Sequence, residues 1–529
     1  MYSSFFTFYW NDSTHKLQRM KTLKSIFHIL LTSALTCSFF INSYSQTFNH
    51  RYIFDDIAAM DFSNIAIKDD TIITIGRGAT FYYPYSTKLM VSKFDFSGEH
   101  LDLLMEYGDS LTTYLPYYGT STFLKEDKML IVGGAGDYFA DDLGFAALVD
   151  SFSSFNWLRT YEPTDSSAAY RFVNGIILEN DSMLYLASRQ SSFDYTINAI
   201  STILIKADNT GEILWEKKIE ATNKSYIPEF ILSESDTSFL IGMQMNQGEN
   251  NFRSAIFKVN GQGDTVFEWI NDSNKTFSPR RIIKSSDGGI IFVCKSFKEM
   301  NQNNYPLYQG YICKLDSSFN KEWELKLGYK SYGTKFLNIA ETYDGNYVAV
   351  GAVSDTFQTE NVRRQKGWLV KFNDSGEVIW DRKIYSNANQ YSVITDIVEA
   401  EDHSLIACGL SQSNNEDYPQ RGWLLKLDEW GCLDPDWCGP DAVTEFPEVP
   451  STYIISPNPA SDYFKVSIPE NANPDDFIYN IVVFNIVGKK MFTTQANGVP
   501  DLSIETTDWP SGMYIVTVND KEAGKVIVK

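Results

Sequence analysis

Between residues 50 and 430 the chain alternates short runs of Val, Ile and aromatic residues with polar turns. In one stretch these runs lie at 336–342, 347–353, 367–373 and 377–384, separated by Asp-Gly and Asp-Ser-Gly turns. Alternation at a period of two, interrupted by Gly and Asp, is typical of antiparallel strands. No long stretch has the 3.6-residue period of a helix. The pattern therefore predicts an all-β region built from units of four strands.

The four-strand unit repeats along the chain. The acid or amide that opens one of its turns recurs every 52–58 residues, at Asp95, Asp150, Asp208, Asn260, Asp316, Asn373 and Asp428. A lysine precedes it by two residues in every copy but the second, at Lys93, Lys206, Lys258, Lys314, Lys371 and Lys426. Independent β-rich runs end with the same period, at Gly76, Gly133, Ala187, Gly242, Cys294, Gly351 and Gly409. Seven copies of four strands predict a seven-bladed β-propeller over residues 46–430.

The number of strands also predicts how the ring closes. The seventh copy has three strands and then enters a segment rich in Cys and Pro, whereas an unassigned strand, 51–54, precedes the first copy. We predict that this N-terminal strand completes the last blade, which leaves no exposed sheet edge.

The recurring Asp/Asn-x-x-Gly turn is interpreted as structural. Its first side chain can accept hydrogen bonds from amides within the turn, and its glycine suits a left-handed conformation. A calcium loop would need alternating acids and a distal Glu, which the turns lack. Trp215, Trp323 and Trp380 follow these turns, and here the chain resembles the tryptophan-docked blades of quinoprotein-like or WD-like propellers. The resemblance implies a fold in which the tryptophan wedges between blades, and we assign no quinone or other cofactor.

The N-terminal residues 1–45 predict an export signal, with Met20 as the true start. Lys21 and Lys24 precede an apolar stretch, 26–41, and small residues precede Gln46. Polar interruptions and short length argue against a membrane-spanning helix, so we expect none in the mature chain. Thr36 fits a lipid-attachment box before Cys37 poorly.

The tail predicts a second domain. After a linker at 431–450, residues 451–529 read as alternating strands of a small β-sandwich. Its motifs resemble the type A C-terminal sorting domain of the type IX secretion system of Bacteroidetes. The residues that carry the resemblance are Pro457, Asn458, Pro459, Ala460, Ser461, Asn485, Gly488, Lys489, Gly512, Tyr514, Lys525 and Lys529. The resemblance implies export through the inner membrane, recognition by the type IX machinery, and cargo that is surface-attached or released. An ordinary adhesive β-domain is the alternative.

The charge of the chain limits its partners, and the positions of its cysteines predict their chemical state. A net charge of −22 would repel a phosphate backbone, which argues against nucleic acid as a partner. Cys432 and Cys438 are close enough in an exported chain to predict a disulfide. The remaining cysteines of the propeller, Cys294, Cys313 and Cys408, lie in apolar runs and are expected to be buried thiols.

No catalytic, metal-binding or cofactor-binding residue is assigned. His50, His100 and His403 lie outside any nucleophile or metal motif. The aromatic residues that do not follow the repeat mark a possible ligand face in the longer loops: Tyr82, Tyr83, Tyr85, Tyr138, Phe139, Tyr305 and Tyr308. Tyrosines suit a carbohydrate or protein ligand.

The sequence thus favours a secreted or cell-surface binding protein. An extracellular hydrolase or lyase acting on polysaccharide or peptide is the alternative, with Asp137, Asp141 and Asp142 as the nearest acidic cluster. A structural component of the cell envelope is the third hypothesis.

Overall fold

The structure is a computed structural model that describes residues 47–80, 87–106, 113–116, 122–125, 127–137, 140–150, 154–163, 168–191, 200–219, 225–246, 252–272, 275–300, 306–331, 333–354, 365–386, 391–413, 420–433, 454–467, 478–485, 489–497, 501–518 and 521–529. Over these ranges the regular secondary structure consists of strands, with no helix. The chain divides into two compact units, with the division between Thr444 and Glu445. Each unit is described by itself.

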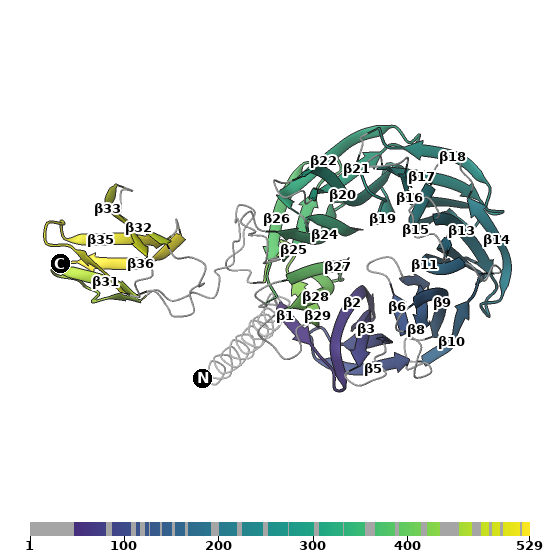
Figure 1. Ribbon diagram of the computed structural model, residues 1–529, viewed down its shortest axis with the longest axis horizontal. Coiled ribbons are helices and arrows are strands. Elements are labelled where there is room, and N and C mark those ends of the chain that lie inside the picture. Colours follow the sequence, from purple (N-terminus) through teal and green to yellow (C-terminus); the bar gives the residue numbers. More distant parts are fainter. Residues whose placement is uncertain are drawn as a thin grey trace, which may run out of the picture. The chain divides into compact units, whose positions relative to one another are not determined.

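The first unit is the predicted seven-bladed propeller (Figure 1). The first blade contains β2 Ile57–Lys68, β3 Thr71–Thr80, β4 Thr87–Phe94 and β5 His100–Glu106. The second contains β6 Thr113–Pro116, β7 Thr122–Lys125, β8 Lys128–Asp137, β9 Ala140–Asp150 and β10 Ser154–Tyr161. The third contains β11 Ala168–Ile177, β12 Met183–Ser191, β13 Ile200–Ala207 and β14 Ile213–Ile219. The second blade departs from the four-strand prediction because two short strands, β6 and β7, share its innermost position beside β8.

The fourth to seventh blades keep the four-strand order. The fourth blade contains β15 Ser225–Ser235, β16 Ser238–Asn246, β17 Phe252–Asn260 and β18 Thr265–Ile270, and the fifth contains β19 Arg281–Lys284, β20 Ile290–Met300, β21 Pro306–Leu315 and β22 Lys321–Ser331. The sixth contains β23 Lys335–Glu341, β24 Tyr347–Ser354, β25 Gln365–Phe372 and β26 Val378–Ile384. The seventh contains β27 Tyr391–Glu399, β28 Leu405–Gln412 and β29 Gln420–Leu427 with β1 Phe48–Tyr52. Strands β2, β6, β11, β15, β19 and β27 lie toward the centre, and β5, β10, β14, β18, β22 and β26 lie at the rim (Figure 1).

The ring closes as predicted, by pairing the first strand with the last. Strand β1 runs antiparallel to β29, with Phe48 opposite Lys426 and Tyr52 opposite Gly422. The indole of Trp423 donates to the Asn49 side chain at 2.7 Å. The strand occupies 48–52 rather than 51–54, because Phe48 is the residue that enters the core.

The recurring turn has the predicted structural role. Asp208 accepts hydrogen bonds from the backbone amides of Thr210 and Glu212 at 2.9 and 3.0 Å. The same pair of bonds recurs at Asp95, Asn260, Asp316, Asn373 and Asp428. The fourth residue has a positive φ in all six turns: Gly98, Gly211, Gly263, Phe319, Gly376 and Gly431. A shared turn geometry therefore accounts for the acid and the glycine of the repeat.

The repeat lysine joins these turns together. Lys314, 2% exposed, lies 2.7 Å from Asp287 in the hairpin between the first two strands of its own blade. It also lies 2.6 Å from Asp374 in the next blade's turn. Lys371 and Lys426 bind the equivalent hairpin acids, Asp344 and Asp402. Both kinds of tight turn thus lie at one end of the blades, which we call the tight-turn face.

Among the described residues, outer strands dock on the turns of the following blades, as predicted for the tryptophans. A β-carbon built on Gly263 would lie 3.2 Å from the ring of Trp215, and one on Gly376 would lie 3.0 Å from Trp323. Trp157, which the sequence did not single out, donates its indole to the backbone of the next turn at Asn209. Where the turn carries Phe319 instead of glycine, Phe267 packs on it with ring centroids 4.9 Å apart.

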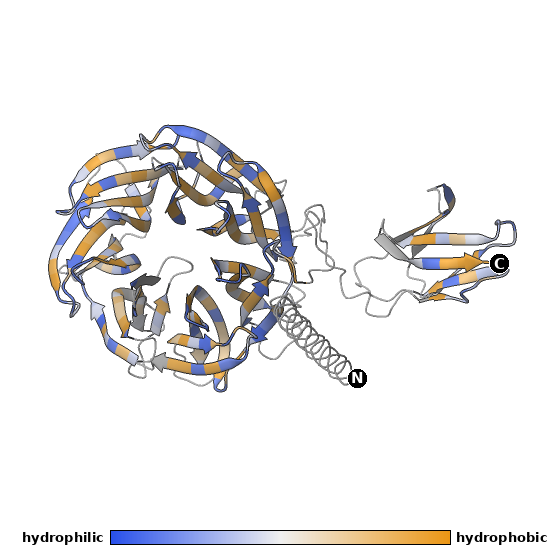
Figure 2. Ribbon diagram, turned by 180° about the vertical axis from the view of Figure 1, so that it is seen from behind, coloured by the Kyte–Doolittle hydropathy of each residue, from blue (hydrophilic) through white to orange (hydrophobic). Residues whose placement is uncertain are grey.

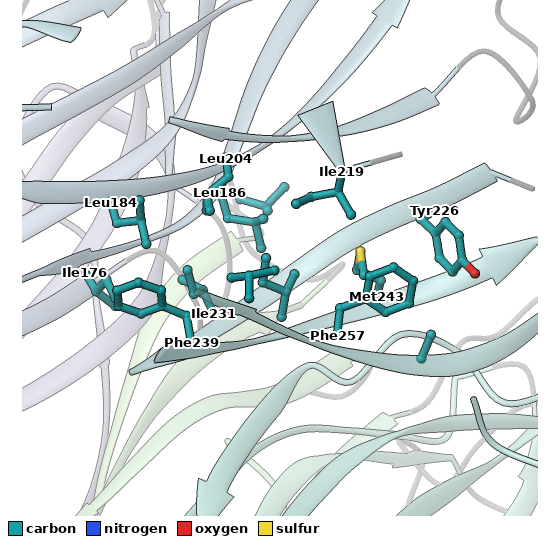
Figure 3. Close-up of a cluster of buried hydrophobic side chains, with 14 of the residues drawn as sticks. Ile176, Leu184, Leu186, Leu204, Ile219, Tyr226, Ile231, Phe239, Met243 and Phe257 are labelled. Carbon is teal, nitrogen blue, oxygen red and sulfur yellow. The ribbon is translucent and has the colours of Figure 1, made fainter. Parts of the chain in front are cut away.

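Apolar side chains fill the spaces between neighbouring blades. Figure 2 shows hydrophobic residues concentrated in the inner strands, whereas the rim strands alternate with hydrophilic residues. The cluster between the third and fourth blades includes Ile176 and Leu204 from one sheet and Phe239, Met243 and Phe257 from the next (Figure 3). This packing makes the ring a rigid frame for whatever lies at its centre.

The second unit is the predicted β-sandwich. One sheet contains β30 Ile454–Ser456, β31 Tyr463–Ser467 and β34 Asp501–Glu505; the other contains β32 Ile478–Asn485, β33 Lys490–Asn497, β35 Gly512–Val518 and β36 Lys521–Val528. Phe464, Ile481 and Val516 are fully buried between the sheets.

Candidate functional site: the central cavity of the propeller

Polar side chains occupy one level of the inner strands. Five of them, which we call the polar ring, stand opposite the same position of the second strand in their blades: Asn64, Asn174, Arg281, Asn338 and Asp396. A β-bulge immediately precedes the ring residue in four of the five blades, all but that of Arg281. Bulges re-aim side chains, so the repeated irregularity brings polar groups to the propeller axis.

Asp396 is the centre of a hydrogen-bond network across three blades. Asn338 donates to its carboxylate at 2.6 Å, and Asn64 donates at 3.4 Å. The backbone amides of Ile65 and Ile397 donate at 3.0 and 2.8 Å. The first, sixth and seventh blades are therefore tied together beside the closure of the ring.

Burial has the largest effect on the protonation of Asp396. It raises the pKa of this carboxyl to about 6, against the opposing influence of Arg281 and the donated hydrogen bonds. The carboxyl lies deep within the ring yet lines the cavity, so it remains partly exposed to water there. An acid with a pKa near 6 changes charge close to neutral pH.

Arg281 carries the positive charge of the polar ring. Its guanidinium carbon lies 5.0 Å from the centroid of the Phe230 ring. Within the described ranges its guanidinium forms no hydrogen bond or ion pair, and its buried Nε has no acceptor. Its neighbour Arg280, by contrast, lies 2.7 Å from Glu229.

These residues line a cavity of about 1150 Å³. The cavity extends from the polar ring to Tyr343 and His403 on the tight-turn face. Tyr343 is 84% exposed, and its ring packs against His403 with centroids 4.6 Å apart. Glu399 lies 3.6 Å from Nδ1 of His403. Such a cavity is large enough for a small ligand, with polar groups at its depth and an aromatic residue at its mouth.

The predicted ligand face falls mostly outside the described residues. Tyr82, Tyr83, Tyr85, Tyr138, Phe139 and Tyr305 lie outside, and the side chains of Asp137, Asp141 and Asp142 are likewise not described. Tyr308 is half-buried in β21. It packs against Phe277, and Lys295 Nζ lies 4.4 Å from the centroid of its ring. The participation of these loops in binding stays a prediction.

Sequence reasoning missed the polar ring, Tyr343 and the position of His403. A signal for the ring was present, because its polar residues precede Gly76, Ala187, Cys294, Gly351 and Gly409 by 12 or 13 residues. Inner strands are buried on all sides in a filled propeller, so a repeated polar residue there indicates a lined cavity.

The predicted sorting residues are divided between core and surface. Tyr514 is 3% exposed and donates to the Pro510 carbonyl at 2.6 Å. Asn458 is exposed. Its side-chain nitrogen donates to the Lys525 carbonyl, and its side-chain oxygen accepts from the backbone amide of Ile527, both in β36. Pro457, Pro459, Lys489 and Gly512 are exposed, and Gly488 lies outside the described residues.

Other candidate chemistry is limited in the described part of the chain. No group of three or more His, Cys, Asp or Glu residues there could hold a metal ion. Cys294, Cys313 and Cys408 are buried free thiols, as predicted. Cys438 lies outside the described residues, so the disulfide to Cys432 stays a prediction. Among the described residues, no helix is long and apolar enough to cross a membrane.

Solved structures with a similar chain path have low sequence identity. A polysaccharide lyase, Uly1, is 9% identical, with a TM-score of 0.41 over 74% of this chain and 94% of the lyase. The endosialidase of phage phi92 is 11% identical, with a TM-score of 0.41 over 76% of this chain and 71% of the enzyme. Drosophila Semaphorin 2a is 9% identical, with a TM-score of 0.45 over 92% and 97%. No curated protein matches the sequence.

The C-terminal unit has a family match. Residues 454–529 match the family described as the secretion system C-terminal sorting domain. This agrees with the sorting motifs and with the sandwich of β30–β36. The chain is therefore cargo of the type IX secretion system, sent to the cell surface or beyond, with a β-propeller ahead of its sorting domain.

Proposed function

We propose that the propeller is an extracellular binding module whose ligand occupies the central cavity. The observation that carries the proposal is the repeated polar ring, which lines a cavity of about 1150 Å³ within a rigid frame. Rigid scaffolds with a concave site and a few polar groups are typical of small-ligand recognition. The polar lining of the cavity and the exposed ring of Tyr343 suit a carbohydrate or a peptide segment.

A glycan and peptide array tests this proposal. Residues 47–529 would be screened first, and the best ligand would then be titrated against Tyr343→Ala. We expect affinity to fall at least about tenfold, because exposed aromatic residues at a cavity mouth contribute much of the contact energy. Leu214→Ala, which removes an exposed side chain from the rim, is the matched control. Unchanged affinity in Tyr343→Ala would place the ligand elsewhere.

One observation favours an enzyme as the second candidate. Asp396, whose pKa is about 6, has the protonation behaviour of a general acid in polysaccharide or peptide cleavage. Four donors already occupy its oxygens, however, which favours a structural role. Turnover of a polysaccharide or peptide that Asp396→Asn abolishes, with binding retained, would support the enzyme instead of the binding module.

The remaining proposals concern processing. We propose that an export signal lies within residues 1–45, that Cys432 and Cys438 form a disulfide in the segment 431–450, and that the host belongs to the Bacteroidetes. Mass spectrometry of the secreted protein tests the first two: the mature chain should begin at Gln46 and carry the cross-link. A reporter fused to residues 451–529 should leave a host with type IX secretion. Periplasmic retention would contradict the proposal that this segment is sufficient.

A further inference from the structure

Arg281 is a half-buried cation that forms no ion pair within the described residues. Its guanidinium lines the central cavity, and no acceptor among the described residues reaches its Nε. A charge held away from water is costly unless it is paired. Proteins accept such costs at functional sites, where a ligand supplies the missing partner.

Asp396 does not provide that partner. Its carboxylate lines the same cavity, but its oxygens already accept from Asn338, Asn64 and two backbone amides. No ion pair joins it to Arg281 in the described structure, although the two charges influence each other. Glu229 is likewise occupied, by Arg280 and by the Ser278 hydroxyl.

Further cations lie near Arg280, the residue that precedes Arg281 in the chain. Burial, together with the charge of Arg280, lowers the pKa of both Lys295 and Lys335 to about 8. Both lysines still carry most of their charge at pH 7. Three cations therefore gather around Arg280, beside the strand that carries Arg281, in a chain of net charge −22.

We propose that Arg281 binds the carboxylate group of a small ligand in the central cavity. This deepens the proposed function and rests on it. The planar guanidinium can donate two parallel hydrogen bonds to a carboxylate, and it lies over the Phe230 ring. The acids at the cavity mouth, Glu341, Glu399 and Glu401, disfavour a highly charged polyanion. The ligand therefore carries an isolated carboxylate on an otherwise uncharged body.

A sugar acid and an acylated amino acid both present such a carboxylate, so the experiment has two arms. Glucuronate is titrated against glucuronamide, and N-acetylalanine against its amide, by calorimetry with residues 47–529 at pH 7. The acid should bind at least about tenfold more tightly than its amide in one arm, which identifies the source. Equal affinity of acid and amide in both arms, or no binding of either acid, would overturn the assignment to Arg281.

Variants locate the site. Arg281→Gln should abolish the preference for the acid. Arg281→Lys should retain part of the preference, because lysine keeps the charge but cannot donate two parallel hydrogen bonds. Lys218→Gln, which removes an exposed charge from the rim strand β14, away from the cavity lining, is the matched control and should leave the preference intact. Thermal melts verify that each variant is folded. An Arg281→Gln protein that melts normally and keeps the preference would overturn the assignment. Equal, undiminished binding of acid and amide would leave the broader binding function standing.

Discussion

The closure of the ring by β1 can be tested by moving the start of the chain. One variant begins at Asp55 and lacks β1, and its matched control begins at Thr47. Both lack residues 1–46 and differ only in residues 47–54, so the comparison isolates the strand that pairs with β29. We expect the shorter chain to be folded but clearly less stable.

The size of the effect follows from the contacts of the strand. Phe48 is 6% exposed and belongs to the same core cluster as Phe62 and Leu424, and removal of a buried Phe side chain costs about 3–5 kcal/mol. Trp423 is fully buried and would lose its acceptor, Asn49, at a further cost of about 1–3 kcal/mol. The entropy of the deleted residues offsets part of this, which leaves a net loss of about 5 kcal/mol. For roughly 390 residues, the unfolding entropy converts that loss to a fall in Tm of about 6 °C.

Differential scanning calorimetry on the two chains measures the shift. A synthetic peptide covering 46–56 should restore the melting temperature of the shorter chain, because the edge of β29 is then paired again. Without the peptide, size-exclusion chromatography should detect association through that open edge. Melting temperatures that agree within about one degree would refute the reasoning.

Three further predictions concern the turns, the lysine network and the cavity. Gly376→Ala should destabilise the propeller by about 1–3 kcal/mol more than Gly345→Ala. Both glycines have a positive φ, but only a β-carbon at Gly376 would press on Trp323. Equal urea midpoints of the two variants would contradict this. Lys314→Ala should cost about 1–3 kcal/mol, because it removes a buried ammonium that pairs with partly exposed acids of two blades. Lys326→Ala, at the rim, should change the unfolding free energy by less than about 0.5 kcal/mol. The raised pKa of Asp396 favours the protonated carboxyl in the folded protein, so the stability that this residue contributes is complete below pH 4 and is lost as the pH rises through 6. The unfolding free energy of Asp396→Asn should therefore rise by about 2–3 kcal/mol relative to that of the parent between pH 4 and 7. A difference in urea titrations that stays constant over this pH range would refute the shift.

Most of the fold could be read from repetition along the chain. The spacing of the turn acids predicted the blades, and the missing fourth strand of the last copy predicted the role of β1. Local hydrogen bonding explains this success, since Asp208 and Gly211 act within their own turn. The second blade was less predictable because its inner position is shared by β6 and β7, which pair with β8 at different points.

The candidate site was less predictable than the fold. The long loops drew attention because their aromatic residues do not follow the repeat, yet the described cavity is lined by residues of the inner strands. Asn338 and Asp396 are 58 residues apart, and no local pattern reveals that their side chains meet at 2.6 Å. Only the curvature of the closed ring brings them together.

The sequence by itself determined the repeat, the turns, the docking tryptophans and the sorting domain, because each depends on residues a few positions apart. The tertiary structure alone decided that Arg281 faces a cavity without a partner, that four donors hold Asp396, and that Tyr343 stands at the mouth. Those properties depend on the burial and the charge that several blades contribute together. They arise only when distant strands converge on one axis and exclude most of the water between them.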